Sequence, residues 1–288
     1  MLRLAAALLA AAVATTPQPQ VLFAVVDGPE KGLAIEPIAM VTKTPGPCAG
    51  CWRLRFVDPM DDDNMTQDDF AARYFRHGRT YRVLAGGGDA GTATVDEEVS
   101  LGCESLAASL MPPLPDYRGL AVGSMHVAPR KVVRDEPTAA EKKVLYRLAR
   151  KAFRDKGVPS ALFPDMEGLS LLSADLNHDG KRDLVGAFEA VGDKTKEYHD
   201  YHRLFLIAMA DDAGGYRTEY VWYSRLAPGT NEARTETMTL VDTIDLDEDG
   251  TDEVIATTNY YESHDYVVLK RSPSGTWGIV YRGAGSGC

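Results

Sequence analysis

Two acidic segments that share a nine-residue pattern, Asp175–Asp183 and Asp245–Glu253, constrain the fold of this chain more than any other feature. Apolar segments flank each one, and each unit continues through a polar loop, an apolar segment, a glycine turn and an aromatic segment. This repetition predicts two successive four-stranded antiparallel sheets. The strands expected are Leu169–Ala174, Leu184–Phe188, Leu204–Ala210 and Tyr220–Tyr223, and then Met238–Ile244, Val254–Thr258, Tyr266–Leu269 and Trp277–Tyr281.

Each acidic segment places oxygen-bearing side chains at its first, third, fifth and ninth positions. Calcium is a hard cation that takes about six to eight oxygen ligands, so a loop of alternating acidic residues suits it. Glycine at the sixth position allows the turn that directs the carbonyl of the seventh residue inward. The sequence therefore predicts two Ca²⁺ sites. The expected ligands are Asp175, Asn177, Asp179, Lys181 and Asp183 in the first loop, and Asp245, Asp247, Asp249, Thr251 and Glu253 in the second.

These loops are not expected to form EF-hands, which need a glutamate at the twelfth position and a helix on each side. The twelfth residues are Gly186 and Ala256, and the flanking segments have the composition of strands. The second loop has carboxylates at all four side-chain positions, whereas the first has three and an asparagine. Because Glu248 and Asp252 add negative charge beside it, we expect the second loop to bind calcium more tightly.

Two such loops, each inside a four-stranded unit, resemble the FG-GAP/VCBS-like repeats of exported β-propeller proteins. The resemblance covers about residues 165–288 and implies that each unit is one blade, with calcium bound between its first two strands. The Phe-Gly and Gly-Ala-Pro motifs of that family are absent from these strands. Only two units are visible, whereas a closed propeller needs at least four blades. Either the N-terminal half supplies degenerate blades, or the repeats form a partial propeller that is closed by other means. The second is favoured, because no acidic loop of this spacing precedes Asp175.

Residues 21–130 are expected to form a small β-rich N-terminal domain. Short apolar segments between proline and glycine turns, such as Val21–Val26 and Thr80–Ala85, are typical of strands. One helix is expected over Gln67–Arg76, with Thr66 as its N-cap.

A second helix is expected over Ala139–Lys156, where apolar residues recur at helical spacing. Thr138 and Glu141 have the spacing of a capping box at its start. We expect this helix, residues 138–156, to link the N-terminal domain to the repeats at 165–288. The chain as a whole is predicted to be mainly β.

The first fourteen residues, 1–14, have the pattern of an export signal. Arg3 supplies a positive charge, Leu4–Ala14 is an apolar run, and Ala12–Ala14 has the small residues of a cleavage site. This run is too short to span a membrane, and we expect no transmembrane segment after its removal. The protein is therefore predicted to be periplasmic or extracellular.

The formal net charge of −11 makes the chain acidic. An acidic protein repels the phosphate backbone, so nucleic acid is not an expected partner.

The four cysteines, an even number in an exported chain, favour disulfide bonds, with three pairings open. They are Cys48, Cys51, Cys103 and Cys288. Cys48 and Cys51 form a C-x-x-C pattern, which leaves a thiol–disulfide protein as one alternative function. Because prolines precede the pair and a strand-like segment, Trp52–Val57, follows it, a structural disulfide is the favoured interpretation.

The function expected is that of a non-catalytic, calcium-binding module with a binding or structural role. The irregular loops Asp193–His202 and Tyr260–Asp265 would carry recognition of a protein or glycan ligand. The alternative is a secreted hydrolase acting on glycan or lipid, which would need a cleft with perturbed carboxylates or histidines between the N-terminal domain and the repeats. His199 and His202 have loose metal-ligand spacing, which an exposed polar loop explains better.

Overall fold

The computed structural model describes residues 20–46, 52–59, 65–86, 88–102, 105–112, 119–122, 136–192, 200–228, 236–283, 285 and 287. The expected signal peptide, all four cysteines and His199 lie outside the described residues. The predictions that depend on them therefore stay predictions.

The N-terminal part of the chain forms an antiparallel barrel of six strands, with a seventh strand added at its rim. The order around the barrel is β1-β7-β4-β5-β6-β2, and pairing between β1 and β2 closes it, while β3 pairs with the outer side of β2. The strands are β1 (Gln20–Asp27), β2 (Leu33–Pro45), β3 (Trp52–Val57), β4 (Thr80–Ala85), β5 (Gly88–Val99), β6 (Ala107–Leu110) and β7 (Gly119–Val122), and a 3-10 turn (Pro29–Lys31) joins the first two.

Strand β1 is buried on both faces, which explains why it is apolar without interruption. Phe23 and Val25 belong to the barrel interior, whereas Leu22 and Ala24 belong to a second core outside the barrel wall. Successive side chains of a strand point to opposite faces, so a strand between two cores must be apolar at every position.

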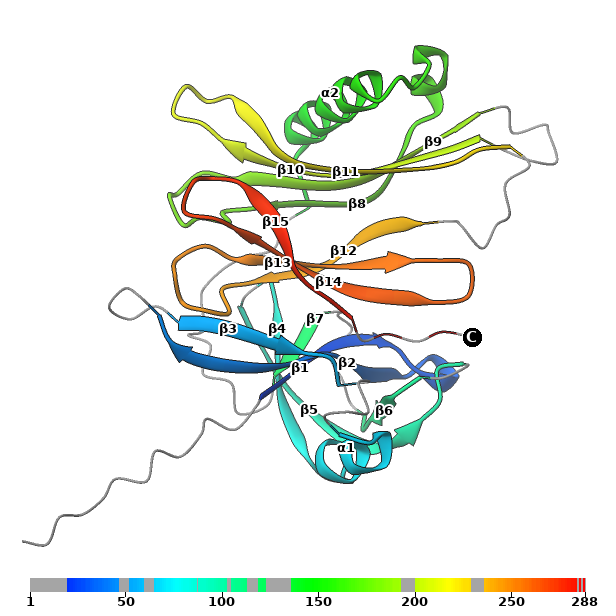
Figure 1. Ribbon diagram of the computed structural model, residues 1–288, viewed down its shortest axis with the longest axis vertical. Helices are drawn as coiled ribbons and strands as arrows, with labels where there is room; N and C mark the ends of the chain where they lie inside the picture. The colour runs from blue at the N-terminus through cyan, green and yellow to red at the C-terminus, as the bar shows by residue number, and fades with distance from the viewer. Residues whose placement is uncertain are drawn as a thin grey trace, which may run out of the picture.

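Helix α1 (Gln67–Tyr74) covers one end of the barrel (Figure 1). Thr66 caps it by accepting the N–H of Asp69 at 3.1 Å, as the sequence predicted. Phe70 and Tyr74 are buried on the barrel side, and the Phe70 ring lies 6.4 Å from that of Phe23. The helix therefore supplies the large side chains that fill this end of the barrel.

The second half of the chain forms two four-stranded antiparallel sheets, which confirms the strand content predicted from the repeat. Each sheet is a meander in which successive strands pair, in the orders β11-β10-β9-β8 and β12-β13-β14-β15. The first consists of β8 (Glu167–Ala174), β9 (Asp183–Gly192), β10 (Asp200–Ala210) and β11 (Tyr216–Leu226); the second of β12 (Thr237–Ile244), β13 (Glu253–Asn259), β14 (His264–Arg271) and β15 (Trp277–Gly283).

The two sheets lie face to face between the barrel and helix α2 (Ala139–Asp155), so the molecule is a stack of layers (Figure 1). Apolar residues of both sheets form the core between them. The barrel wall packs on the outer face of the second sheet, and α2 with the 3-10 turn Ser160–Asp165 packs on the outer face of the first. Both outer faces of the pair of sheets are therefore covered. Within the described residues, neither face is open to a third sheet of this kind.

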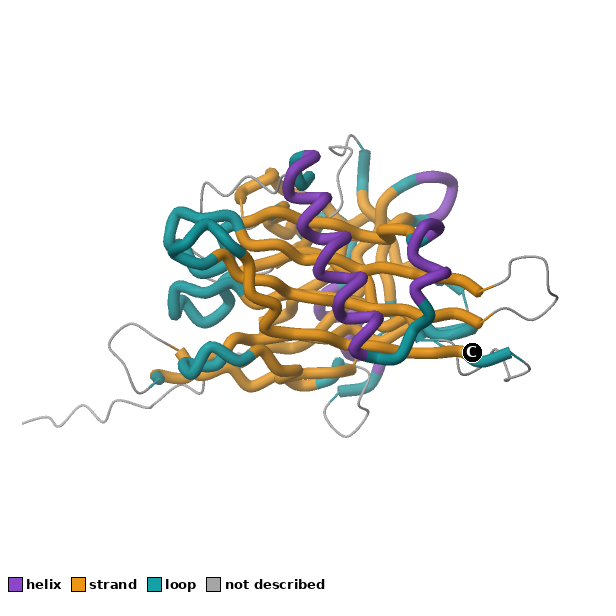
Figure 2. The backbone as a smooth tube through the Cα atoms, turned by 90° about the horizontal axis from the view of Figure 1, so that it is seen from above, coloured by secondary structure: helices purple, strands orange, loops and turns teal. Residues whose placement is uncertain are grey.

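Helix α2 runs across the strands of the first sheet (Figure 2). Its capping box is present, with Thr138 and Glu141 bonded reciprocally at 2.7 and 3.3 Å. Leu145 and Phe153 are fully buried against the sheet. The expected linker helix is thus also the layer that covers one face of the first sheet.

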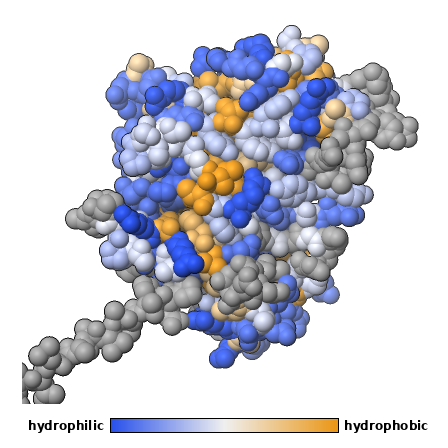
Figure 3. Space-filling model, viewed as in Figure 1, coloured by the Kyte–Doolittle hydropathy of each residue, from blue (hydrophilic) through white to orange (hydrophobic). Residues whose placement is uncertain are grey.

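One face of the molecule is mostly hydrophilic but carries a hydrophobic patch near its middle, at β15 and β3 (Figure 3). Ile279 and Val280 on β15 are 41 % and 49 % exposed. Both strands are at the edge of their sheets, which explains this exposure. In the described part of the chain, no helix is long and apolar enough to cross a membrane.

Candidate metal centre: the paired acidic loops

Both acidic segments lie where the sequence predicts, between the first two strands of a four-stranded sheet. The first joins β8 to β9, and the second joins β12 to β13. At the second position of each loop, Leu176 and Leu246 are fully buried. These leucines anchor the loops on the core, so the polar residues on either side face the loop interior.

The two loops share one backbone conformation. Their fourth residues, His178 and Glu248, have φ values of 56° and 60°, and their sixth residues, Gly180 and Gly250, have φ values of 87° and 92°. Positive φ is unfavourable for residues other than glycine, so it needs compensation by other contacts of the turn. The same turn in both loops is the structural counterpart of the repeat in the sequence.

Hydrogen bonds from the backbone hold the first acidic residue of each loop in place. The carboxylate of Asp175 accepts the N–H groups of the fifth and sixth residues at 3.0 and 2.8 Å. In the second loop, the carboxylate of Asp245 accepts the N–H groups of Asp249 and Gly250 at 3.2 and 3.1 Å. Likewise Asp179 and Asp249 each accept the N–H of the seventh residue at 2.9 Å. The N–H from the seventh residue, Lys181, is the main reason why the pKa of Asp179 lies below its usual value.

The ninth residues, Asp183 and Glu253, are buried carboxylates that close the loops from below. Each accepts the N–H of the leucine at the second position, at 2.9 Å from Leu176 and 2.7 Å from Leu246. Burial raises the pKa of Asp183 to about 6, although Leu176 and Ala210 donate backbone hydrogen bonds that act against this rise. A buried carboxylate of this kind is stabilised by a nearby cation.

The second loop brings three buried carboxylates together. Oxygens of Asp245, Asp247 and Glu253 all lie within 4.8 Å of one another, the one such triad among the described residues. Calcium binds its oxygens at about 2.3–2.6 Å, so ligands around one ion lie no farther apart than about 5 Å. Asp247 is 5 % exposed, and its Oδ1 is buried without a hydrogen-bond partner. The donor set and the unpartnered oxygen therefore fit a calcium ion.

A lysine that sequence reasoning missed lies among these carboxylates. The ammonium of Lys270 on β14 is 2.8 Å from Asp247, 2.8 Å from Asp249 and 2.7 Å from Glu253. Burial works against the charge on Lys270, but Glu253 and the other carboxylates outweigh it and raise the pKa of Lys270. Burial also raises the pKa of Glu253, and Lys270 acts against that rise.

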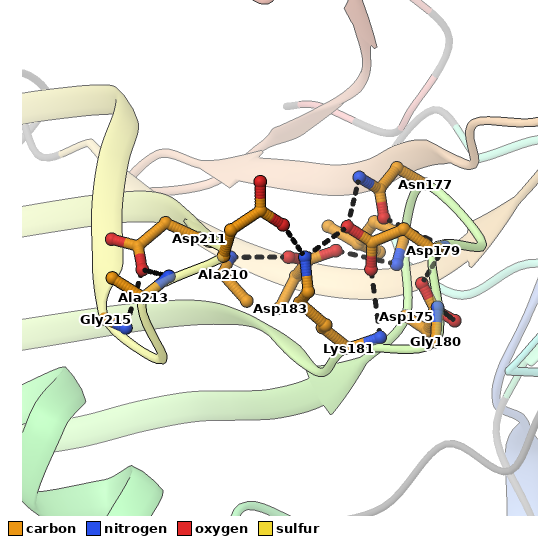
Figure 4. Close-up of polar contacts among 12 residues, drawn as sticks. Asp175, Asn177, Asp179, Gly180, Lys181, Asp183, Ala210, Asp211, Ala213 and Gly215 are labelled. Atoms are coloured by element: carbon orange, nitrogen blue, oxygen red, sulfur yellow. Dashed lines mark hydrogen bonds and ion pairs between the residues drawn. The ribbon is translucent and has the colours of Figure 1, made fainter.

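The first loop borders a pocket of about 390 Å³ beside the turn that joins β10 to β11 (Figure 4). Asn177, Asp179 and Met209 are among its lining residues. Lys181 bridges the loop and the turn, because its ammonium lies 2.6 Å from Asp212 and 3.5 Å from Asp179. This lysine is drawn outward to an exposed partner, unlike the lysine of the second loop.

The two loops contact each other. The N–H of Asp252 donates to the carbonyl of Leu176 at 2.7 Å, and His178 Nε2 lies 3.0 Å from Asp252 Oδ1. On its other side the second loop contacts the barrel, where Trp52 N–H donates to the carbonyl of Asp247 at 3.0 Å. The first loop therefore contacts the second, and the second contacts the start of β3 in the barrel.

His202, the described member of the His199/His202 pair, lies in a sheet and not at a metal site. His202 is 3 % exposed, with Nδ1 2.8 Å from the Tyr223 hydroxyl and Nε2 3.4 Å from Asp200. It is thus a buried part of the first sheet, whereas the sequence places it in an exposed polar loop.

A cleft of about 470 Å³ separates β1 of the barrel from β8, β12 and β13. This is the location at which a hydrolase would need its acidic groups. Asp27 is the one carboxylate among the lining residues, and hydroxyls of Ser170, Thr239 and Thr257 supply most of the other polar groups. Glycoside hydrolysis usually needs two carboxylates at a defined separation, so this lining does not favour that chemistry.

Comparison with known proteins gives no relative. No family model matches the chain, no curated protein matches it, and no solved structure matches it.

Proposed function

We propose that this chain is an exported, non-catalytic module in which calcium, bound by the paired acidic loops, stabilises the two sheets. The loops would also place the chain among the FG-GAP/VCBS-like repeat proteins, with each sheet as one blade. Export and the periplasmic or extracellular location are part of this proposal and rest on residues 1–14 of the sequence.

The observation that carries the proposal is the pair of loops with the same turn and the same backbone hydrogen bonds. Carboxylates gathered this closely repel one another, and the single positive charge of Lys270 offsets only part of this repulsion in the second loop. The second loop adds the orphaned Oδ1 of Asp247, a buried acceptor that a metal ion would satisfy.

The side chains of Asp175, Asn177, Asp179 and Asp183 would hold the ion in the first loop, and those of Asp245, Asp247, Asp249 and Glu253 in the second. Carbonyl oxygens of Lys181 and Thr251 would complete each set. Bound calcium supplies charge neutralisation and cross-linking of the hairpin. The chain's own part is to hold the carboxylates in place, by the turn and by the buried leucine anchors.

Binding of a protein or glycan ligand would fall to surfaces outside the loops, such as the 260–265 turn. Tyr261 in this turn is 57 % exposed. An exposed aromatic ring is suited to stacking against sugar rings or packing against a partner.

Thermal unfolding of the purified protein in calcium and in chelator tests the proposal. We expect calcium to raise the midpoint, and the Asp179→Asn/Asp249→Asn double variant to lose this effect. Glu98→Gln, on the exposed face of β5, is the matched control and should respond like the wild type. If calcium leaves the wild-type midpoint unchanged, calcium is not part of this fold.

A further inference from the structure

The strands beneath the two loops carry different residues at one equivalent position, and the strand register identifies it. In the second sheet Val254 pairs with Leu269, and the next residue along β14 is Lys270. In the first sheet Leu184 pairs with Ala208, and the next residue along β10 is Met209. The pairing of β14 with β15 has a β-bulge just before Leu269, and the pairing of β10 with β11 has one just before Ala208. Lys270 and Met209 therefore occupy equivalent positions in their strands, beneath the acidic loops.

We propose that Lys270 is a built-in cation of the second loop, which competes with calcium there and leaves the first loop as the tighter calcium site. This inference rests on the proposed calcium function and assigns the order of the two sites. It reverses the order expected from the number of carboxylates alone.

The contacts of Lys270 carry the argument. Its ammonium lies within 2.8 Å of three of the four carboxylates that would ligate calcium in this loop: Asp247, Asp249 and Glu253. Glu253 is fully buried and Lys270 only 24 % exposed, so their attraction is poorly screened by water. A calcium ion must displace the ammonium or share its ligands with it, and either change opposes binding.

Among its described neighbours, the first loop has no ammonium that lies within 2.8 Å of three expected ligands. Met209 is an uncharged side chain, 3 % exposed, at the place of Lys270. The nearest lysine, Lys181, contacts one expected ligand, Asp179 at 3.5 Å, and pairs more closely with the exposed Asp212 at 2.6 Å. Arg271 interacts electrostatically with Asp179 and Asp183, but its guanidinium is paired with Glu219 at 2.8 Å. Calcium entering this loop would compete with one longer contact of Lys181, whereas in the second loop it meets an ammonium held by three carboxylates.

Calcium titration of chelator-treated protein, followed by calorimetry and by native mass spectrometry, tests the assignment. In the wild-type background, we expect Asp179→Asn to remove the tighter site and Asp249→Asn to leave it in place. This arm leaves Lys270 unaltered, so it does not depend on the fold of any lysine variant. Removal of the tighter site by Asp249→Asn would overturn the proposal.

The reciprocal exchange of the matching residues gives the second arm. Lys270→Met should raise the calcium affinity of the second loop by at least roughly tenfold, whereas Lys270→Arg, which keeps the charge, should leave it unchanged. Met209→Lys should weaken the first loop. An unchanged second-loop affinity in Lys270→Met would contradict the role of Lys270. If neither the wild type nor any variant binds calcium, the proposed function itself fails, which is a different result from two loops of equal affinity.

Discussion

The backbone N–H of Asp252 donates to the carbonyl oxygen of Leu176 at 2.7 Å, and this hydrogen bond joins the two acidic loops directly. Asp252 precedes Glu253, and Leu176 follows Asp175, so residues next to expected ligands make the contact. A change in one loop therefore reaches the other directly. Removal of the Asp252 side chain leaves this backbone hydrogen bond in place but breaks the second contact between the loops, that of the Asp252 carboxylate with His178.

Asp252→Ala should destabilise the protein by about 2–4 kcal/mol, because the side chain is 1 % exposed and its loss leaves His178 and Thr243 without their bonds to it. Urea unfolding in chelator measures this loss. Asp155→Ala, which removes an exposed carboxylate on α2, should change stability by less than about 0.5 kcal/mol. Equal effects of the two substitutions would show that the side-chain contacts of Asp252 contribute nothing to stability.

Calcium should stabilise the wild type by about 1.4–2.7 kcal/mol for each occupied site at about 10 mM, given that extracellular modules bind with dissociation constants of about 10⁻⁴ to 10⁻³ M. The value follows from the preference of the ion for the folded state, which has the assembled loop. Parallel unfolding curves in calcium and in chelator measure it, and magnesium at the same concentration is the control. We expect a smaller effect of magnesium, because it demands stricter geometry and gives up its water reluctantly.

His202 should make the protein less stable as the pH falls from 7 to 5. Burial lowers the pKa of His202, although Asp200 acts against this. The unfolded chain therefore binds a proton near pH 6.5 that the folded chain does not, and stability is lost as the pH falls below that value.

The difference between wild type and His202→Gln in chelator isolates this contribution from that of the other histidines. We expect the slope of the unfolding free energy against pH between 7 and 5 to be smaller in the variant. Identical slopes would mean that His202 takes up a proton equally in both states.

Glu36 should stabilise the contact between the barrel and the second sheet. It is 2 % exposed and accepts hydrogen bonds from the Tyr266 hydroxyl at 2.7 Å and from His264 at 3.0 Å. Glu36→Ala should cost about 2–4 kcal/mol in urea unfolding, because the buried Tyr266 hydroxyl and the partly buried His264 lose their acceptor. Glu98→Ala on the exposed face of β5 is the control and should be nearly neutral. A loss no larger than that of the control would remove Glu36 from this interface.

Local patterns predicted many of the elements closely. Segments Trp52–Val57 and Thr80–Ala85 are strands with the expected bounds, and α2 ends one residue before its predicted end. Strand β6 (Ala107–Leu110) was missed, because four residues with two alanines carry too little β signal on their own. Strand β10 begins at Asp200, before the predicted Leu204, because pairing with β9 extends it into polar residues.

Closure of the barrel was not predictable from these local patterns. It depends on β1 pairing with both β2 and β7, which joins residues about 100 positions apart in the sequence. Short-range signals indicate where a strand forms but not with which strands it pairs. The partial propeller inferred from the repeat likewise stays a proposal, since what the structure establishes is two stacked sheets with covered outer faces.

The sequence by itself determined the two acidic loops, because their turn depends on residues within nine positions: alternating acids, a glycine and a buried leucine. The same turn therefore recurs in both repeats. Only the tertiary structure placed Lys270 among the carboxylates and Asp252 against Leu176. The register of β13 with β14 and the stacking of the two sheets decide these contacts, and both arise from long-range packing that no local pattern encodes.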